Sequence, residues 1–212
     1  MLGDGFMSKV SPAFIAARKE EIISACANLY QTMSFKEITM IEIGKATSFT
    51  RTSIYNYFKT KEEIFLALLQ KEYELWVEEL DEIANTHESL TKSELAHALA
   101  FSLENRKRLL KLMSMNHFDM EMNSRQENLT EFKKAYGNSL KAVGRCLDKF
   151  CPNFNEADKK NFLYAFFPFV YGIYPYTAVS EKQKKAMDIA NVNFQYHSIY
   201  ELAYNCILRL LT

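Results

Sequence analysis

The chain has 212 residues, of which 48% are hydrophobic and 25% charged, and its formal net charge at pH 7 is zero. This length and apolar content are sufficient for one large or two small packed domains. A net charge of zero excludes a protein that coats nucleic acid through bulk positive charge. Any DNA binding would therefore have to come from a local patch, doubled by dimerisation.

The cysteines and the N-terminus bear on the compartment. Cys26, Cys146, Cys151 and Cys206 are scattered, and residues 1–10 have neither the charged-then-apolar order nor the cleavage pattern of a secretory signal. We therefore expect a cytoplasmic protein, because free cysteines fit a reducing compartment. Redox sensing is kept as an alternative, although Cys146 and Cys151 are too far apart for a pair with two intervening residues.

Proline and glycine are scarce, and almost every long segment has helical periodicity, which predicts an all-α protein. The first long helix is expected over residues 18–33. Its apolar residues recur at spacings that place them on one face: Ile22, Cys26, Leu29, Tyr30 and Met33.

Two short helices are predicted next, in the pattern of a helix-turn-helix. Thr39 is placed to cap a helix over residues 40–46, and Glu42 would complete a capping box. Gly44 lies in this helix, where a crossing helix could come close. After a break at residues 47–49, Thr50 is placed to cap a second helix over residues 51–58.

The second helix would bury Phe49, Ile54 and Phe58, and its remaining side chains are hydrogen-bonding groups without a carboxylate. Such a face suits phosphates and base edges. We expect Arg51 to pair with guanine and Asn56 with adenine, although a solvated surface arginine is the simpler alternative. The candidate DNA-binding residues are Thr39, Thr50, Arg51, Thr52, Ser53, Tyr55, Asn56, Tyr57 and Lys61.

The run Ser48-Phe49-Thr50-Arg51-Thr52-Ser53-Ile54-Tyr55-Asn56-Tyr57-Phe58, followed by Lys61-Glu62, resembles the signature of the tetracycline-repressor (TetR) family. The resemblance covers roughly residues 15–70, about a quarter of the chain. It implies a helix-turn-helix DNA-binding domain over residues 1–62 and a helical effector-binding and dimerisation domain over residues 63–212. It also implies a bacterial, ligand-responsive transcriptional repressor that binds a palindromic operator as a homodimer, with Tyr55, Tyr57 and Lys61 at phosphates.

Two serines depart from the family pattern. Ser34 and Ser48 stand where members usually carry glycine, which adopts a left-handed backbone without penalty. We therefore expect each serine to cost on the order of 1 kcal/mol if it adopts that conformation.

The rest of the chain is predicted to form further helices. A long one begins near Lys61 and runs for roughly 23 residues, or about 35 Å, which is long enough to connect a DNA-reading head to a second body. Others are expected over residues 92–104, 106–116 and 128–150, with a looser stretch at 117–126.

The last two major helices are expected over residues 162–179 and 192–211. The first carries no charge and is apolar on two sides, so one side should face a partner. The family resemblance implies dimerisation through these helices. A membrane span is the alternative, opposed by Pro168, Gly172 and Pro175. The expected dimer-interface residues are Phe167, Val170, Tyr174, Tyr196, Tyr200, Ile207 and Leu211.

The resemblance further implies an effector cavity in the second body, and its aromatic content favours an apolar or aromatic small molecule. Plain core packing is the alternative for each candidate lining residue. We expect no cofactor. Metal sensing is a weaker alternative, because no histidine has a convincing set of ligands at helical spacing. The candidate lining residues are Phe101, Met113, Met115, Phe118, Tyr136, Phe166 and Tyr171.

Two other functions compete with the repressor hypothesis. An enzyme is disfavoured because the sequence has no Gly-rich phosphate loop, no nucleophile elbow and no convincing His–carboxylate set. The other alternative is a helical interaction or sensor protein that keeps the fold but has lost operator binding.

Overall fold

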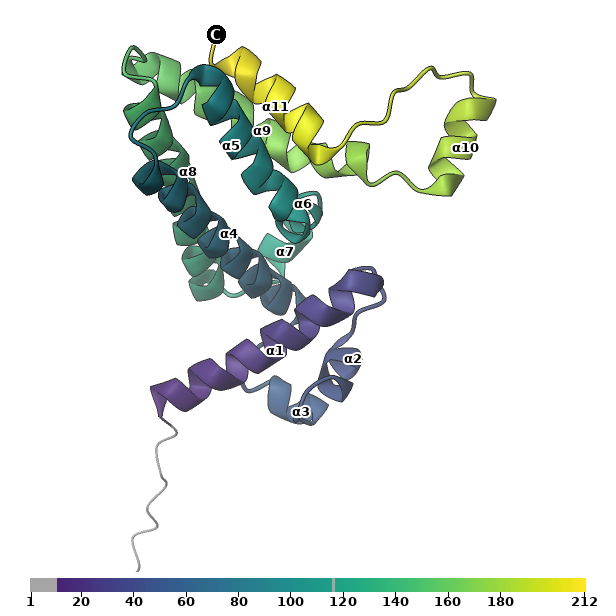
Figure 1. Ribbon diagram of the computed structural model, residues 1–212. Coiled ribbons are helices and arrows are strands. Elements are labelled where there is room, and N and C mark those ends of the chain that lie inside the picture. The colour runs from purple at the N-terminus through teal and green to yellow at the C-terminus, as the bar shows by residue number, and fades with distance from the viewer. Residues whose placement is uncertain (1–10, 116) are drawn as a thin grey trace, which may run out of the picture. The chain divides into compact units, whose positions relative to one another are not determined.

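The computed structural model describes residues 11–115 and 117–212, and the regular secondary structure of this part of the chain is entirely α-helical (Figure 1). This confirms the predicted fold class. The helices are α1 Pro12–Thr32, α2 Met40–Lys45, α3 Arg51–Ile54, α4 Lys61–Thr86, α5 Lys92–Asn105, α6 Lys107–Met113, α7 His117–Met122, α8 Gln126–Phe150, α9 Glu156–Thr177, α10 Glu181–Ile189 and α11 Ile199–Leu210.

The chain divides into two compact units. The first ends at Leu68 and also takes in residues 118–129, whereas the second comprises 69–117 and 130–212. The division therefore falls within α4, a few residues beyond the expected boundary after residue 62. The return of residues 118–129 to the first unit is a long-range contact that periodicity along the sequence does not reveal.

The first unit is built on α1, which begins six residues earlier than expected. Its start is fixed by Ser11, whose hydroxyl accepts a hydrogen bond from the Phe14 amide, and by Pro12 at the first helical position. Tyr30 on α1 packs edge-on against Phe65 of α4, with ring centroids 5.2 Å apart.

Helices α2 and α3 cross at Gly44, as expected. A Cβ atom added to Gly44 would lie 3.4 Å from the Arg51 amide nitrogen, so the glycine permits the close approach. The predicted extent of α3 to residue 58 is wrong, because α-helix ends at Ile54. The chain then tightens: the Asn56 and Tyr57 amides donate to carbonyls three residues back, those of Ser53 and Ile54.

The second unit packs helices around an aromatic centre. Trp76 of α4 is fully buried, and its indole N–H donates to Ser102 Oγ of α5 at 3.0 Å. Its ring lies 6.4 Å from that of Phe166 and 6.0 Å from that of Phe167 on α9. These large side chains fill the middle of the unit.

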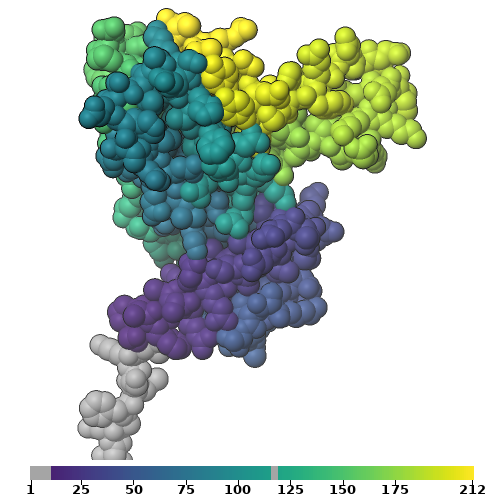
Figure 2. Space-filling view, viewed as in Figure 1, coloured from purple at the N-terminus to yellow at the C-terminus, as the bar shows by residue number. Residues whose placement is uncertain are grey.

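Helix α9 remains helical through Pro168 and Pro175 and starts at a capping box formed by Asn155 and Asp158. The closing helix α11 starts at Ile199 and not near residue 192, because Ser198 and Glu201 form another capping box there. It packs against α5 and α9. Between α9 and α11, α10 buries none of its residues and stands out from the bundle of its own unit (Figure 2).

No single helix in the described chain is long and apolar enough to cross a membrane. Only α9 and α10 taken together, bent by 86° at their junction, pass that test by length and composition.

Candidate nucleic-acid interface

The N-terminus of α3 is fixed by its own side chains. Thr50 Oγ1 accepts a hydrogen bond from the Ser53 amide at 3.2 Å and lies 2.9 Å from Ser53 Oγ. Both hydroxyls are therefore engaged in the cap, as expected for Thr50. Arg51, Thr52 and Asn56 are exposed around this cap and free of carboxylate partners among the described residues.

Arg51 and Tyr55 form a pair on the exposed side of α3. The guanidinium NH2 donates to the Tyr55 hydroxyl at 3.3 Å, and its carbon lies 5.8 Å from the centroid of the Tyr55 ring. This spacing of four residues aligns the two side chains on one helical face. The contact restricts the arginine, so less conformational entropy is lost when it binds a base or phosphate.

Tyr57 and Lys61, both predicted to lie at phosphates, also make contacts within their own unit. The half-buried Tyr57 ring packs edge-on against Phe49, with centroids 5.9 Å apart. Lys61 Nζ donates to the carbonyls of Phe35 and Ile38, at 2.7 and 3.2 Å, and lies 4.1 Å from the Phe35 ring centroid. One of its three donors is left for a phosphate.

Thr39 caps α2, since its hydroxyl accepts from the Glu42 amide at 3.3 Å. The expected reciprocal half of the capping box is not formed, because Glu42 pairs instead with Lys45 at 2.9 Å. That pair neutralises the only carboxylate in α2.

The expectation of strain at Ser34 and Ser48 is wrong. Among the described residues, the only non-glycine residue with positive φ is Asn191, so neither serine adopts a left-handed backbone. Ser48 is held by α1: its amide donates to Glu21 Oε1 at 2.7 Å, and its hydroxyl accepts from Arg18 at 3.0 Å. The amide of Ser48 is the main reason that the pKa of Glu21 lies below its ordinary value. These bonds hold the turn between α2 and α3 against α1, and so fix the orientation of α3 within its unit.

A second set of contacts holds the recognition segment, by which we mean α3 and the turn after it (residues 50–59). It joins Glu63 to Arg125, and sequence reasoning missed it. Arg125 Nε donates to Glu63 Oε1 at 2.7 Å and its NH2 to Oε2 at 3.0 Å, while the Lys59 amide also donates to Oε2 at 2.7 Å. The same NH2 reaches the Tyr57 carbonyl at 3.2 Å. Burial opposes ionisation of Glu63, but these bonds outweigh it and lower its pKa.

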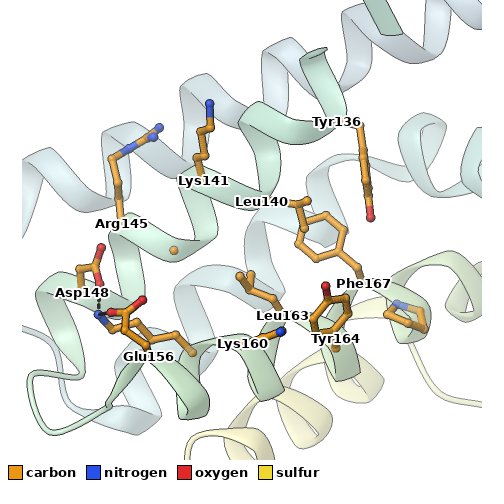
Figure 3. A pocket seen from close by; sticks show the side chains of 13 residues that line it. Tyr136, Leu140, Lys141, Arg145, Asp148, Glu156, Lys160, Leu163, Tyr164 and Phe167 are labelled. Atoms are coloured by element: carbon orange, nitrogen blue, oxygen red, sulfur yellow. Dashed lines mark hydrogen bonds and ion pairs between the residues drawn. The ribbon is translucent and has the colours of Figure 1, made fainter. Parts of the chain in front are cut away.

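The candidate effector-lining residues lie in different surroundings. Phe166 and Met113 are buried in the core, and Phe101 is 53% exposed. The Tyr171 hydroxyl accepts from that of Tyr73 at 3.0 Å. Met115 is half-buried, and Phe118 lies outside the residues whose side chains are described. Only one candidate, Tyr136, lines a described groove, which lies between α8 and α9 (Figure 3).

Four expected dimer-interface residues are buried inside their own unit, so that prediction is wrong for them. They present no surface to a second copy because neighbouring helices already cover them: Phe167, Val170, Ile207 and Leu211. Tyr174 is half-buried and Tyr196 is 43% exposed. Tyr200 is half-buried, and its hydroxyl lies 2.8 Å from His97 Nδ1.

The four cysteines are free, and Cys26, Cys146 and Cys151 are buried. No three His, Cys, Asp or Glu side chains there are grouped as metal ligands. Burial raises the pKa of the Cys26 thiol to about 12 and that of Cys146 to about 11, so both stay protonated near neutral pH.

Comparison with known proteins identifies both parts of the chain. Residues 22–68 match the model for bacterial regulatory proteins of the tetR family, and residues 70–209 match that for the tetracyclin repressor-like C-terminal domain. A search of curated proteins found no significant match.

Solved structures share the fold at low sequence identity. A TetR/AcrR-family transcriptional regulator from Thermobifida fusca is 18% identical with a TM-score of 0.62, covering 92% of this chain and 97% of its own. A protein described as a TetR-family transcriptional regulator from Mesorhizobium loti is 15% identical with a TM-score of 0.59, covering 93% and 96%. The fatty acid degradation regulator FadR from Bacillus halodurans is also 15% identical, with a TM-score of 0.52 and coverage of 96% and 97%.

Proposed function

The chain belongs to the TetR family of DNA-binding transcriptional regulators, and on this premise we propose that it is a homodimeric repressor released from a near-palindromic operator by a small molecule. Members of this family are transcription regulators and not enzymes, and they bind DNA and small-molecule effectors, typically as dimers. The operator, the dimer and the effector response of this particular chain are the content of the proposal.

The observation that carries the proposal is the exposed face of α3. Arg51 and Thr52 project from α3, and Asn56 projects from the turn that follows it. The cap of α3, its crossing with α2 and this turn are all held by specific contacts. Arginine can bind guanine and asparagine adenine through paired hydrogen bonds in the major groove. Tyr55, held against Arg51, is placed to reach a neighbouring phosphate.

Dimerisation is supported by the surface of α9. Its exposed residues recur every three or four positions and form a stripe of small and aromatic groups: Tyr164, Ala165, Pro168, Gly172, Pro175 and Tyr176. Tyr164 is 72% and Tyr176 58% exposed, which is unusual for large apolar rings. A second copy related by a two-fold axis would cover this stripe and present two α3 helices to successive major grooves.

The test is selection of bound duplexes from a random library by the purified protein and by an Arg51→Ala/Tyr55→Ala variant. We expect a near-palindromic motif with half-sites about one helical turn apart. Arg51→Ala alone should reduce discrimination at one base position by about 1–3 kcal/mol. Lys134→Ala, which removes one positive charge from exposed α8 surface, is the matched control and should select the original motif.

Absence of a selected motif would contradict operator binding by the apo protein. Repeating the selection with small-molecule extracts then separates the two remaining explanations. A motif recovered with an extract indicates that the effector promotes DNA binding. Continued absence supports the alternative of a family fold that serves as an interaction or sensor protein.

A further inference from the structure

The turn after α3 is bound by residues that lie 63 and 68 positions later in the chain. Thr60 Oγ1 donates to the Asn123 carbonyl at 2.9 Å, and Arg125 NH2 donates to the Tyr57 carbonyl at 3.2 Å. Arg125 immediately precedes α8, and residues 118–129 belong to the first unit. The turn that carries Asn56 is therefore held at two points by the segment that leads into α8.

Glu63 fixes the orientation of the Arg125 side chain. The carboxylate accepts four hydrogen bonds, from the Nε, NH2 and backbone amide of Arg125 and from the Lys59 amide. It is only 1% exposed, so water does not compete for its oxygens. A planar guanidinium bound through two nitrogens to one carboxylate has a defined direction, and here that direction brings NH2 to the Tyr57 carbonyl.

The turn depends on this support because α-helix ends at Ile54. The Asn56 and Tyr57 amides bond to carbonyls three residues back, a geometry that is poorer than that of α-helix. The buried Phe58 side chain holds the inner side of the turn. Arg125 supplies the contact at the carbonyl next to the exposed Asn56, and so restrains the backbone from which that side chain projects.

We propose that Arg125 is a positioning residue for operator recognition: it contacts no DNA, and it fixes the turn from which Asn56 reads a base. This inference rests on the proposed operator binding. The other end of the recognition segment is held separately, through the Ser48 amide and Glu21. Loss of Arg125 should therefore affect the base pair read by Asn56 more than the one read by Arg51.

Three variants separate the position of the turn from charge and from folding. Arg125→Met keeps the aliphatic stem and removes every donor. Arg125→Lys keeps the charge, but an ammonium lacks the planar fork that serves both Glu63 oxygens and the Tyr57 carbonyl. Arg125→Met/Glu63→Gln removes both charges, so no carboxylate is left buried without its cation.

Arg145→Met on α8 is the matched control. Arg145 also pairs with a carboxylate, that of Asp81, and its side chain is 48% exposed, against 40% for Arg125. Both residues of this pair belong to the second unit, so the control removes an arginine ion pair without touching the recognition segment.

The first measurement is the affinity for the operator that the parent protein selects, and for its single-base variants, at several salt concentrations. We expect Arg125→Met and the double variant to bind about tenfold more weakly, as when one paired base contact is lost, with Arg125→Lys in between. Arg145→Met should stay within about twofold. Discrimination should fall mainly at the base pair whose readout Asn56→Ala abolishes. The salt dependence should be unchanged, because no phosphate contact is removed.

The second measurement is amide hydrogen exchange in the free protein, which needs no DNA. In the double variant, the Asn56 and Tyr57 amides should exchange about tenfold faster or more, because the turn opens locally. The Ile43 and Ala46 amides, which bond within and at the end of α2, should change by less than about twofold. They report on the stability of the unit as a whole.

Three results would overturn this role. A shallower salt dependence in Arg125→Met but not in Arg125→Lys would make Arg125 a phosphate ligand. Unchanged operator affinity in the double variant would show that recognition does not need Arg125. Equal acceleration of the turn and α2 amides would show that Arg125 stabilises the whole unit. If the parent protein selects no motif, operator binding itself fails, while amide exchange still decides whether Arg125 holds the turn.

Discussion

At the scale of single residues, the recognition segment depends on side chains that work in pairs. Arg51 is steadied by Tyr55, and Lys61 uses two of its donors on the loop that precedes α2. Glu63, only 1% exposed, takes hydrogen bonds from Arg125 and from the Lys59 amide just beyond α3. The carboxylate therefore connects the end of the recognition segment to the residues before α8.

Glu63 should make stability depend on pH. Its folded-state pKa lies below the ordinary value of 4.5, so ionised Glu63 stabilises the fold above about pH 4.5, and that stabilisation is lost as pH falls through the folded pKa. We expect Glu63→Gln to reduce the unfolding free energy by about 2–3 kcal/mol at pH 7, somewhat below fully buried pairs because Arg125 is partly exposed. The difference should shrink progressively below pH 4.5.

Urea unfolding at several pH values between 3 and 7 measures this effect. Glu62→Gln is the neighbouring control, and its difference from the parent should stay small throughout. A Glu63→Gln difference that is as large at pH 3 as at pH 7 would show that the carboxylate charge is not what stabilises the segment.

At the scale of elements, helix ends are set by local side chains and helix orientation by distant ones. Capping boxes start α5, α9 and α11 at Thr91, Asn155 and Ser198. In contrast, the turn before α3 is held by Glu21 and Arg18, which lie 27 and 30 residues away from Ser48 in sequence. Caps could be predicted from short motifs, whereas the bonds to α1 could not, because they require the folded unit.

The start of α9 provides a test at this scale. Asn155 Oδ1 accepts from the Ala157 and Asp158 amides at 2.8 and 3.0 Å, so Asn155→Ala leaves two helix-start donors without this partner. We expect a loss of about 1–2 kcal/mol in unfolding free energy. Asn153→Ala, in the exposed turn just before, is the control and should have little effect. Equal losses in the two variants, measured by urea unfolding, would mean that the cap does not stabilise α9.

At the scale of the whole molecule, the proposed dimer requires the exposed stripe of α9 to be covered. The stripe sits on the opposite side of α9 from Phe166, Val170 and Ile173, which its own unit buries. A homodimer would couple the positions of two α3 helices, so that the spacing of half-sites follows from the packing of α9. An effector that favours one spacing would thereby alter operator affinity.

A charge within this stripe should separate the protomers. Ala165 is exposed near the N-terminal end of the stripe, between Tyr164 and Pro168, and Ala165→Glu would place a carboxylate in the covered interface. We expect the dissociation constant of the dimer to rise by roughly 30-fold or more, equivalent to at least about 2 kcal/mol. Sedimentation equilibrium measures this, with Asn138→Glu on the exposed surface of α8 as the control. An unchanged dimer in Ala165→Glu would exclude this face as the interface.

The sequence by itself determined the all-α class, the helix-turn-helix and the starts of α2, α3, α4 and α5, because periodicity and capping act within a few residues. Only the tertiary structure decided which side of each helix is buried and which partner each charged side chain contacts. In the folded unit, Lys61 donates to the Phe35 carbonyl in the loop between α1 and α2, and the backbone of Ser48 lies outside the left-handed region. Phe167 and Ile207 lie in the core. The reason is physical: a helix apolar on two sides does not specify which side its neighbours cover, and a charged side chain does not specify its partner. Both are settled by contacts between segments far apart in the chain.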